Sequence, residues 1–294
     1  MSRELFIFGL GFSGKALARL MQTKGWTVTA TARDSAKAKA LADLNITAID
    51  PLDPQAMGAA MRRANAVLIT APPSPAGCPA LPLIVPALAK SAAFPDWIGY
   101  LSTTGVYGDQ GGGWVFENSP LRASSPEGAR RVGAERDWLQ VGQGMGLSVM
   151  VFRLPGIYGP GRSAFERLLA GDARRVIKPG QVFSRIHVDD IASGLAASIA
   201  RPRAGGIYNL CDDEPAPPQD VIAYAADLAG LAWPAQVGVE SLPAIAQRFY
   251  AENKRVSNSL AKQELGWKPA YPTYREGLRS IWKQTQIPPP KTPT

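Results

Sequence analysis

Short apolar runs alternate with stretches of helical periodicity along the first half of the chain. Residues 5–8 form an apolar run that ends at glycine, which is typical of a buried parallel strand. From residue 12 to residue 24 the apolar positions recur at helical spacing. The same alternation predicts strands over 26–31, 46–49, 66–70, 97–101 and 147–152, and helices over 35–44, 54–62, 82–93 and about 127–141. This order indicates βαβ units, and therefore an α/β fold with a Rossmann-like, doubly wound parallel sheet.

A glycine-rich segment joins the first predicted strand to the first predicted helix with the spacing Gly-x-Gly-x-x-Gly. Gly9 permits a tight turn, Gly11 allows the backbone to approach a pyrophosphate, and Gly14 allows close packing of helix on strand. Phe12 and Ser13 then begin the helix, where phosphates bind. The spacing also occurs in ordinary glycine-rich turns, but its place at the start of successive βαβ units favours dinucleotide binding.

The end of the second predicted strand bears on which dinucleotide binds. NAD-binding versions carry an acidic residue there for the ribose 2′-hydroxyl. In this chain Ala32 takes that position, and Arg33 follows where a guanidinium can pair with a 2′-phosphate, with Lys37 one turn on. We therefore predict NADP as cofactor, with NAD as second choice. In the alternative, Arg33 is a solvated loop residue and Asp34 accepts the ribose bonds one place later.

Two further strand ends are candidate cofactor contacts. Asp50, after the third strand, is placed to accept a bond from the adenine amino group, although it is equally an ordinary loop acid. The fourth strand leads into Thr70, Ala71 and Pro72, which we expect to pass beneath the nicotinamide ribose.

The rhythm of strands and helices loosens after residue 156, where proline and glycine become frequent. We expect residues 1–156, together with the segment 182–212, to form the dinucleotide-binding domain, and residues 157–286 to form a smaller substrate lobe. Residues 287–294 contain four prolines in eight positions and are expected to be a disordered tail.

Composition and charge narrow the class of protein. With no secretory leader and no apolar stretch near the ~20 residues of a membrane span, we expect a cytoplasmic protein. The net charge of +8 suits phosphorylated ligands. The basic residues are scattered and no nucleic-acid motif is present, so we expect a small-molecule substrate and no nucleic acid.

Two cysteines and one histidine predict free thiols and no metal site. No Gly-x-Ser-x-Gly element of a serine hydrolase is present.

Beyond residue 101 the sequence resembles the extended short-chain dehydrogenase/reductases, a group that contains nucleotide-sugar epimerases and dehydratases. Four segments carry the resemblance, namely Leu-Ser-Thr-Thr-Gly-Val-Tyr-Gly-Asp at 101–109, Arg-Leu-Pro-Gly-Ile-Tyr-Gly-Pro-Gly-Arg at 153–162, Ile-His-Val-Asp-Asp-Ile-Ala at 186–192 and Leu-Gly-Trp-Lys-Pro at 265–269. Their order over nearly the whole chain implies the same two-lobed fold. The resemblance is also compatible with a homodimer formed through two long helices.

The resemblance implies a catalytic Ser or Thr and a Tyr-x-x-x-Lys pair, in which the lysine lowers the tyrosine pKa so that it exchanges a proton during hydride transfer. Thr103 occupies the Ser/Thr position, four residues before Tyr107, although a strand-end hydroxyl also serves to bond backbone. Counting back from Glu135 places Arg131 in the lysine position and Glu127 in the tyrosine position. The chain therefore departs from the family pattern at both members of the pair.

Other residues offer substitutes for the missing pair. Arg131 can still bond the nicotinamide ribose, Glu127 can act as a general base, and Tyr107 and Tyr158 follow strands that end at the cofactor crevice. Tyr107 is more simply a packing residue, and the Tyr-x-x-x-Lys at 250–254 comes too late in the chain to be the family's pair.

The turn at 186–192 holds the only histidine. His187 with Asp189 and Asp190 resembles an acid–base set, but the resemblance favours a structural turn in which an aspartate caps a helix starting near Ile191.

Two functions follow from these observations. The first is an NADP-dependent oxidoreductase or epimerase-like enzyme acting on a sugar nucleotide or another polar carbonyl compound, with Arg162 and Arg185 holding an anionic group of the substrate. The second is a catalytically silent NADP(H)-binding sensor or scaffold, which the missing Tyr and Lys favour.

Overall fold

A seven-stranded parallel sheet forms the centre of the computed structural model, which describes residues 3–286. Its strands are β1 (Glu4–Phe8), β2 (Thr27–Thr31), β3 (Thr47–Ile49), β4 (Ala64–Ile69), β5 (Trp97–Thr103), β7 (Val149–Leu154) and β11 (Ile207–Asn209). They lie in the order β11-β7-β5-β4-β1-β2-β3, with every pairing parallel. This confirms the predicted Rossmann-like, doubly wound fold.

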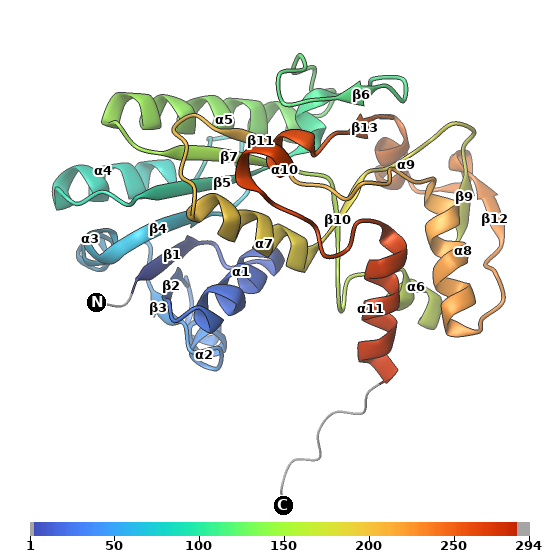
Figure 1. Ribbon diagram of the computed structural model, residues 1–294, viewed down its shortest axis with the longest axis horizontal. Coiled ribbons are helices and arrows are strands. Elements are labelled where there is room, and N and C mark those ends of the chain that lie inside the picture. Colours follow the sequence, from blue (N-terminus) through green and yellow to red (C-terminus); the bar gives the residue numbers. More distant parts are fainter. Residues whose placement is uncertain (1–2, 287–294) are drawn as a thin grey trace, which may run out of the picture.

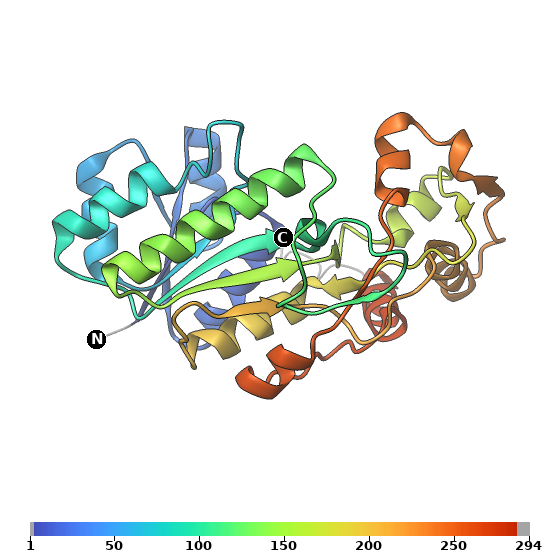
Figure 2. The ribbon, with the colours of Figure 1, turned by 90° about the horizontal axis from the view of Figure 1, so that it is seen from above.

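Helices cover both faces of the sheet (Figures 1 and 2). One face carries α1 (Phe12–Thr23), α2 (Ser35–Ala42), α7 (Val188–Ile199) and α10 (Ser259–Leu265); the other carries α3 (Pro54–Arg63), α4 (Leu81–Ser91) and α5 (Pro126–Met145). Along β1, Leu5 and Ile7 enter the first core while Phe6 and Phe8 enter the second. The uninterrupted apolar run of β1 follows from this burial on both faces.

A smaller lobe lies at one end of the sheet (Figure 2). It contains α6 (Ala164–Leu169), β9 (Arg175–Ile177), α8 (Pro218–Ala229), β12 (Gln236–Gly238), a 3-10 turn (Val239–Ser241), α9 (Ala244–Tyr250) and α11 (Tyr274–Gln286). Its helices α6, α8 and α11 pack around a core of their own that includes Phe165, Val221 and Leu278. The expected tail at 287–294 lies outside the described residues.

Several connections cross between the two lobes. β8 (Gly156–Tyr158) pairs with β10 (Arg185–His187), and β6 (Trp114–Val115) pairs with β13 (Arg255–Val256). The segment 182–212 thus contributes β10, α7 and β11 to the larger lobe before the chain returns to the smaller one. Within the part of the chain described, no helix is both long and apolar enough to cross a membrane.

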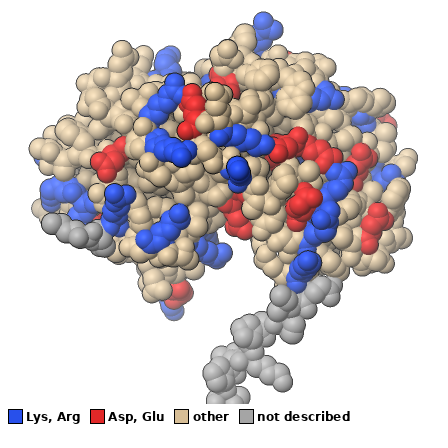
Figure 3. Space-filling model, viewed as in Figure 1, with Lys and Arg blue, Asp and Glu red and all other residues tan. Residues whose placement is uncertain are grey.

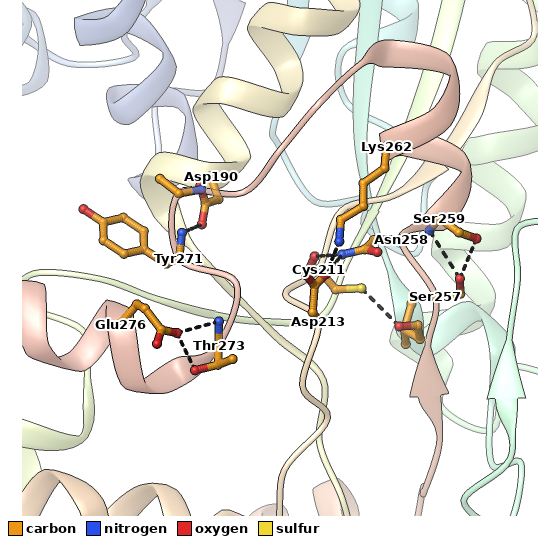
Figure 4. A network of polar contacts seen from close by, with 12 residues as sticks. Asp190, Cys211, Asp213, Ser257, Asn258, Ser259, Lys262, Tyr271, Thr273 and Glu276 are labelled. Atoms are coloured by element: carbon orange, nitrogen blue, oxygen red, sulfur yellow. Dashed lines mark hydrogen bonds and ion pairs between the residues drawn. The ribbon is translucent and has the colours of Figure 1, made fainter.

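Carboxylates fasten the C-terminal segment to the larger lobe (Figure 4). Asp190 of α7 accepts the backbone N–H of Ala270 at 2.6 Å and that of Tyr271 at 3.0 Å, and Asp213 accepts the amide of Asn258 at 2.7 Å. Burial raises the pKa of Asp190 to about 6 in spite of these bonds. Asp190, the second aspartate of the His-Val-Asp-Asp turn, therefore has a structural role, because it binds the backbone of the C-terminal segment.

The start of α7 corrects one expectation from the sequence. The helix begins at Val188, and its cap is His187, whose Nδ1 accepts the N–H of Asp189 at 3.2 Å. The expected aspartate cap near Ile191 was wrong, because the histidine side chain already satisfies the first turn and Asp190 is used by the C-terminal segment.

Candidate cofactor and active site

Gly9 holds three strand ends together at the carboxyl edge of the sheet. Its φ of +84° is one that side chains disfavour, and a Cβ there would lie 3.3 Å from the Cβ of Ala71. Its N–H donates to Oγ1 of Thr31 at 3.0 Å, and its carbonyl accepts the hydroxyl of Thr70. The ends of β1, β2 and β4 are thereby fixed around one turn. Thr70 and Ala71, which were expected beneath the nicotinamide ribose, therefore contact the glycine loop at Gly9.

Gly11, by contrast, faces open space. It is the N-cap of α1 with an extended backbone, and a Cβ built on it would meet nothing within 4 Å. No side chain caps α1 and no acidic residue lies in its first turn. The N–H groups of Phe12, Ser13 and Gly14 have no partner within the helix and form the positive end of its dipole. A dinucleotide pyrophosphate fits this opening.

The residues after β2 and β3 differ in what their side chains do. Asp34 caps α2 by accepting the N–H of Lys37 at 2.7 Å, and Asp50 accepts the N–H of Leu52 at 2.9 Å. Both carboxylates therefore bond their own backbone segments. Arg33 is exposed and takes part in no ion pair among the described residues.

Thr103 is the last residue of β5, at the edge where the cofactor crevice is expected. Its Oγ1 accepts the N–H of Gly105 at 3.1 Å and so caps the 3-10 turn Thr104–Tyr107. The hydroxyl proton is still able to donate to a bound oxygen, because capping uses only an oxygen lone pair. Both roles considered for Thr103 are compatible with this geometry.

The two residues in the positions of the family's pair, both on α5, bind different partners. Glu127 lies exposed in the first turn, where its own backbone amide and Arg130 lower its pKa. The guanidinium of Arg131 donates to the carbonyl of Leu101 on β5 and lies 5.9 Å from the ring centroid of Tyr100. Arg131 is thus directed onto the sheet.

Both tyrosines considered as alternative acids are withdrawn from solvent. Tyr107 is fully buried, donates to Asn209 at 2.7 Å and accepts from Arg153 at 3.0 Å. Burial raises the pKa of Tyr107 to about 12 and also raises that of Tyr158. The hydroxyl of Tyr158 lies against Gly277 of α11. These surroundings favour packing over proton transfer.

A buried ion pair beneath the candidate site escaped the sequence reasoning. Glu135 of α5 and Arg153 of β7 meet at 2.7 Å with side chains only 3% and 2% exposed. Ser102 of β5 donates to the same carboxylate, and the guanidinium also bonds Tyr107 and the carbonyl of Glu117. The pair joins two strands and α5. The only sequence signals were that Arg153 begins the family-like segment 153–162 and that Glu135 is the residue from which the family's pair was counted back.

The two arginines expected to hold an anionic substrate have different surroundings. The guanidinium of Arg185 donates to the carbonyls of Phe183 at 2.8 Å and Ala216 at 3.1 Å, and burial lowers its pKa. Arg162 is exposed, and its guanidinium lies 5.7 Å from the ring centroid of Phe12. The structure therefore places Arg162 beside the glycine loop and uses Arg185 to join backbone segments.

The Tyr-x-x-x-Lys at 250–254 has no helical geometry. Tyr250 is the last residue of α9, and Lys254 lies beyond the helix, paired with Glu252. The two side chains do not share a helix face, in agreement with the interpretation that this match is a coincidence.

Charges are interleaved over the face seen in Figure 3, which is hollowed between the two lobes. Lys and Arg are scattered among Asp and Glu over most of that face, apart from one run of basic side chains down the smaller lobe. Cys78 and Cys211 are both buried and free, as expected.

Comparison with known proteins assigns the family. The sequence model of the NAD dependent epimerase/dehydratase family matches residues 87–211. Protein YeeZ of Escherichia coli K12 is 30% identical over 92% of this chain and 97% of its own length. A functionally unknown conserved protein from Silicibacter pomeroyi superposes with a TM-score of 0.88 at 43% identity, covering 97% of this chain and 100% of that one.

A more distant structure shares the fold. The dTDP-glucose 4,6-dehydratase of Bacillus anthracis in complex with NAD superposes with a TM-score of 0.77 at 18% identity, over 97% of each chain. The family match covers α5, the carboxyl ends of β5 and β7, and the connection to the second lobe, while the glycine loop lies before it. The chain belongs to the NAD-dependent epimerase/dehydratase family.

Proposed function

We propose that this protein is an NADP(H)-dependent oxidoreductase or epimerase-type enzyme that acts on a sugar nucleotide or another polar carbonyl compound. The open glycine loop carries the proposal. Gly11 and the first turn of α1 offer free N–H donors at the carboxyl edge of the sheet, where α/β folds bind dinucleotides. When bound, the nicotinamide would supply hydride transfer.

The preference for NADP is supported by the residues after β2. Ala32 cannot accept bonds from a ribose 2′-hydroxyl, and the carboxylate of Asp34 already caps α2. Arg33 is exposed and directly follows, so a 2′-phosphate would meet a guanidinium and no competing free acid.

The substrate class is supported by relatives. A dTDP-glucose 4,6-dehydratase of Streptomyces griseus is 31% identical over 58% of this chain and 53% of its own. In this proposal the hydroxyl of Thr103 would donate to a substrate oxygen beyond β5. Glu127 would be the carboxylate that accepts a proton, although its lowered pKa makes it a weaker base than an ordinary glutamate.

One observation favours a second function, binding of NADP(H) without turnover. Arg131 donates to the carbonyl of Leu101 on the sheet, whereas Glu127 is exposed and pairs with Arg130. A proton relay requires its groups within hydrogen-bond reach of one another and of substrate. Such a protein would act as a sensor or scaffold.

The test is a fluorescence titration with NADPH and with NADH, using the wild type, Arg33→Ala and Lys39→Ala. Lys39 is an exposed residue of the same loop–helix unit and controls for the lost charge. We expect micromolar NADPH binding, weaker NADH binding, and a loss of about tenfold in NADPH affinity alone for Arg33→Ala. Equal losses for both cofactors would reject the 2′-phosphate role, and binding of neither by the wild type would reject the function. A turnover screen with sugar nucleotides then separates the enzyme from the silent binder.

A further inference from the structure

A tight turn at the start of the second lobe presents Arg162. Gly159 and Arg162 exchange backbone hydrogen bonds at 3.1 and 3.0 Å around Pro160 and Gly161. Gly161 has φ +75°, so proline and glycine occupy the positions that a type II turn requires. The backbone at Arg162 is therefore held firmly between β8 and α6.

This turn is seated on the first residue of α1. A Cβ at Gly159 would come within 3.1 Å of the ring of Phe12 and 2.6 Å of Val188, so only glycine allows this approach. The guanidinium of Arg162 lies 5.7 Å from the centroid of the Phe12 ring, a distance compatible with cation–π attraction. The positive charge of Arg162 is therefore held next to Phe12, the first residue of α1.

The surroundings of this guanidinium favour an anion. The first turn of α1 carries no acidic residue, and Arg162 takes part in no ion pair among the residues that the structure describes. The positive end of α1 and a free guanidinium therefore converge with no negative partner. A guanidinium matches a phosphate with two parallel hydrogen bonds.

We infer that Arg162 binds the pyrophosphate of the dinucleotide, which makes it a cofactor residue and not the substrate residue that its place in the sequence suggested. The inference rests on the proposed function. Gly11 opens one side of the pyrophosphate site, the N–H groups of α1 form its base, and the second lobe supplies Arg162 from the other side. Cofactor binding would then join the two lobes.

The experiment measures binding of NADPH by fluorescence and of ADP-ribose and adenosine by competition, in the wild type, Arg162→Ala, Arg162→Lys and Arg19→Ala. ADP-ribose contains the pyrophosphate but neither the 2′-phosphate nor nicotinamide, and adenosine contains no phosphate. Arg19 lies exposed further along α1 and controls for net charge. Urea unfolding of each variant shows that the fold is retained.

We expect Arg162→Ala to weaken NADPH and ADP-ribose binding by about ten- to a hundredfold each, with adenosine unchanged and Arg162→Lys intermediate. Unchanged ADP-ribose affinity in Arg162→Ala would overturn the inference while leaving the proposed function intact. A wild type that binds no dinucleotide would overturn both.

Discussion

Replacing Gly11 with valine separates the cofactor role of the glycine loop from its structural role. The backbone of Gly11 has φ −94° and ψ −164°, which a β-branched residue adopts without strain. A Cβ there meets nothing within 4 Å. The variant is therefore expected to fold like the wild type while its side chain occupies the approach to the N-terminus of α1.

The magnitudes follow from these surroundings. An exposed substitution without clashes changes the free energy of unfolding by no more than about 0.5 kcal/mol. Loss of the charge-assisted bonds from the N–H groups of α1 costs about 1.5–3 kcal/mol for each bond to a charged group, so two lost bonds weaken binding by more than a hundredfold. Gly9→Val, in contrast, is expected to lower the stability of the fold as well as cofactor binding. The φ of Gly9 is +84°, and a Cβ there would lie 3.3 Å from the Cβ of Ala71.

The assay combines urea unfolding with fluorescence titration of NADPH and NADH. Gly144→Val is the matched control, since Gly144 is exposed at the far end of α5 and a Cβ there also meets nothing within 4 Å. Retained dinucleotide binding by Gly11→Val would refute the assignment of this loop to the cofactor. A large loss of stability would refute the geometric argument for open space.

Two further predictions concern buried ionisable groups. Glu135→Leu should lower the free energy of unfolding, measured in urea, by about 3–5 kcal/mol, because Arg153 is left charged and buried. The double variant Glu135→Leu, Arg153→Met should lower it much less. Equal losses in the two variants would assign the effect to packing. His187 is fully buried and burial lowers its pKa, so below about pH 6.5 the unfolded state takes up a proton that the native state does not, and stability falls as the pH falls. NMR titration of the single labelled histidine should give a pKa below that of an exposed histidine; a value at or above it would contradict the prediction.

The larger lobe was predictable from sequence because its signals are local. Residues 5–8 form β1 in full, with Glu4 added, and α1, α3 and α4 match their expected spans within two residues. The long helix was predicted to end near residue 141, but α5 continues to Met145, where Gly146 in the left-handed region closes it. The smaller lobe offered little periodicity, since its strands β9 and β12 have three residues each.

The candidate site shows the same difference between features set by local sequence and features set by distant contacts. The glycine loop was predictable, because the turn, the close approach and the helix start all depend on neighbouring residues. The direction of Arg131, the complete burial of Tyr107 and the position of Arg162 beside Phe12 depend on contacts between distant segments. The spacing along α5 showed that Arg131 replaces the lysine of the family's pair, but it did not show that its guanidinium bonds Leu101.

The pKa directions around the site limit the chemistry that this chain performs by itself. Tyr107, with a pKa of about 12, and Tyr158, raised by burial, both keep their protons near neutral pH and lie in closed surroundings. Glu127, with a lowered pKa, is ionised and suits acceptance of a proton more than donation. Under the proposed function, the hydroxyl of Thr103 would hydrogen-bond a substrate oxygen, and the proton delivered to that oxygen would come from solvent through this hydroxyl. A reaction that needs a strong acid is disfavoured at this edge, and one that needs only a positioned hydroxyl beside a bound dinucleotide is compatible with it.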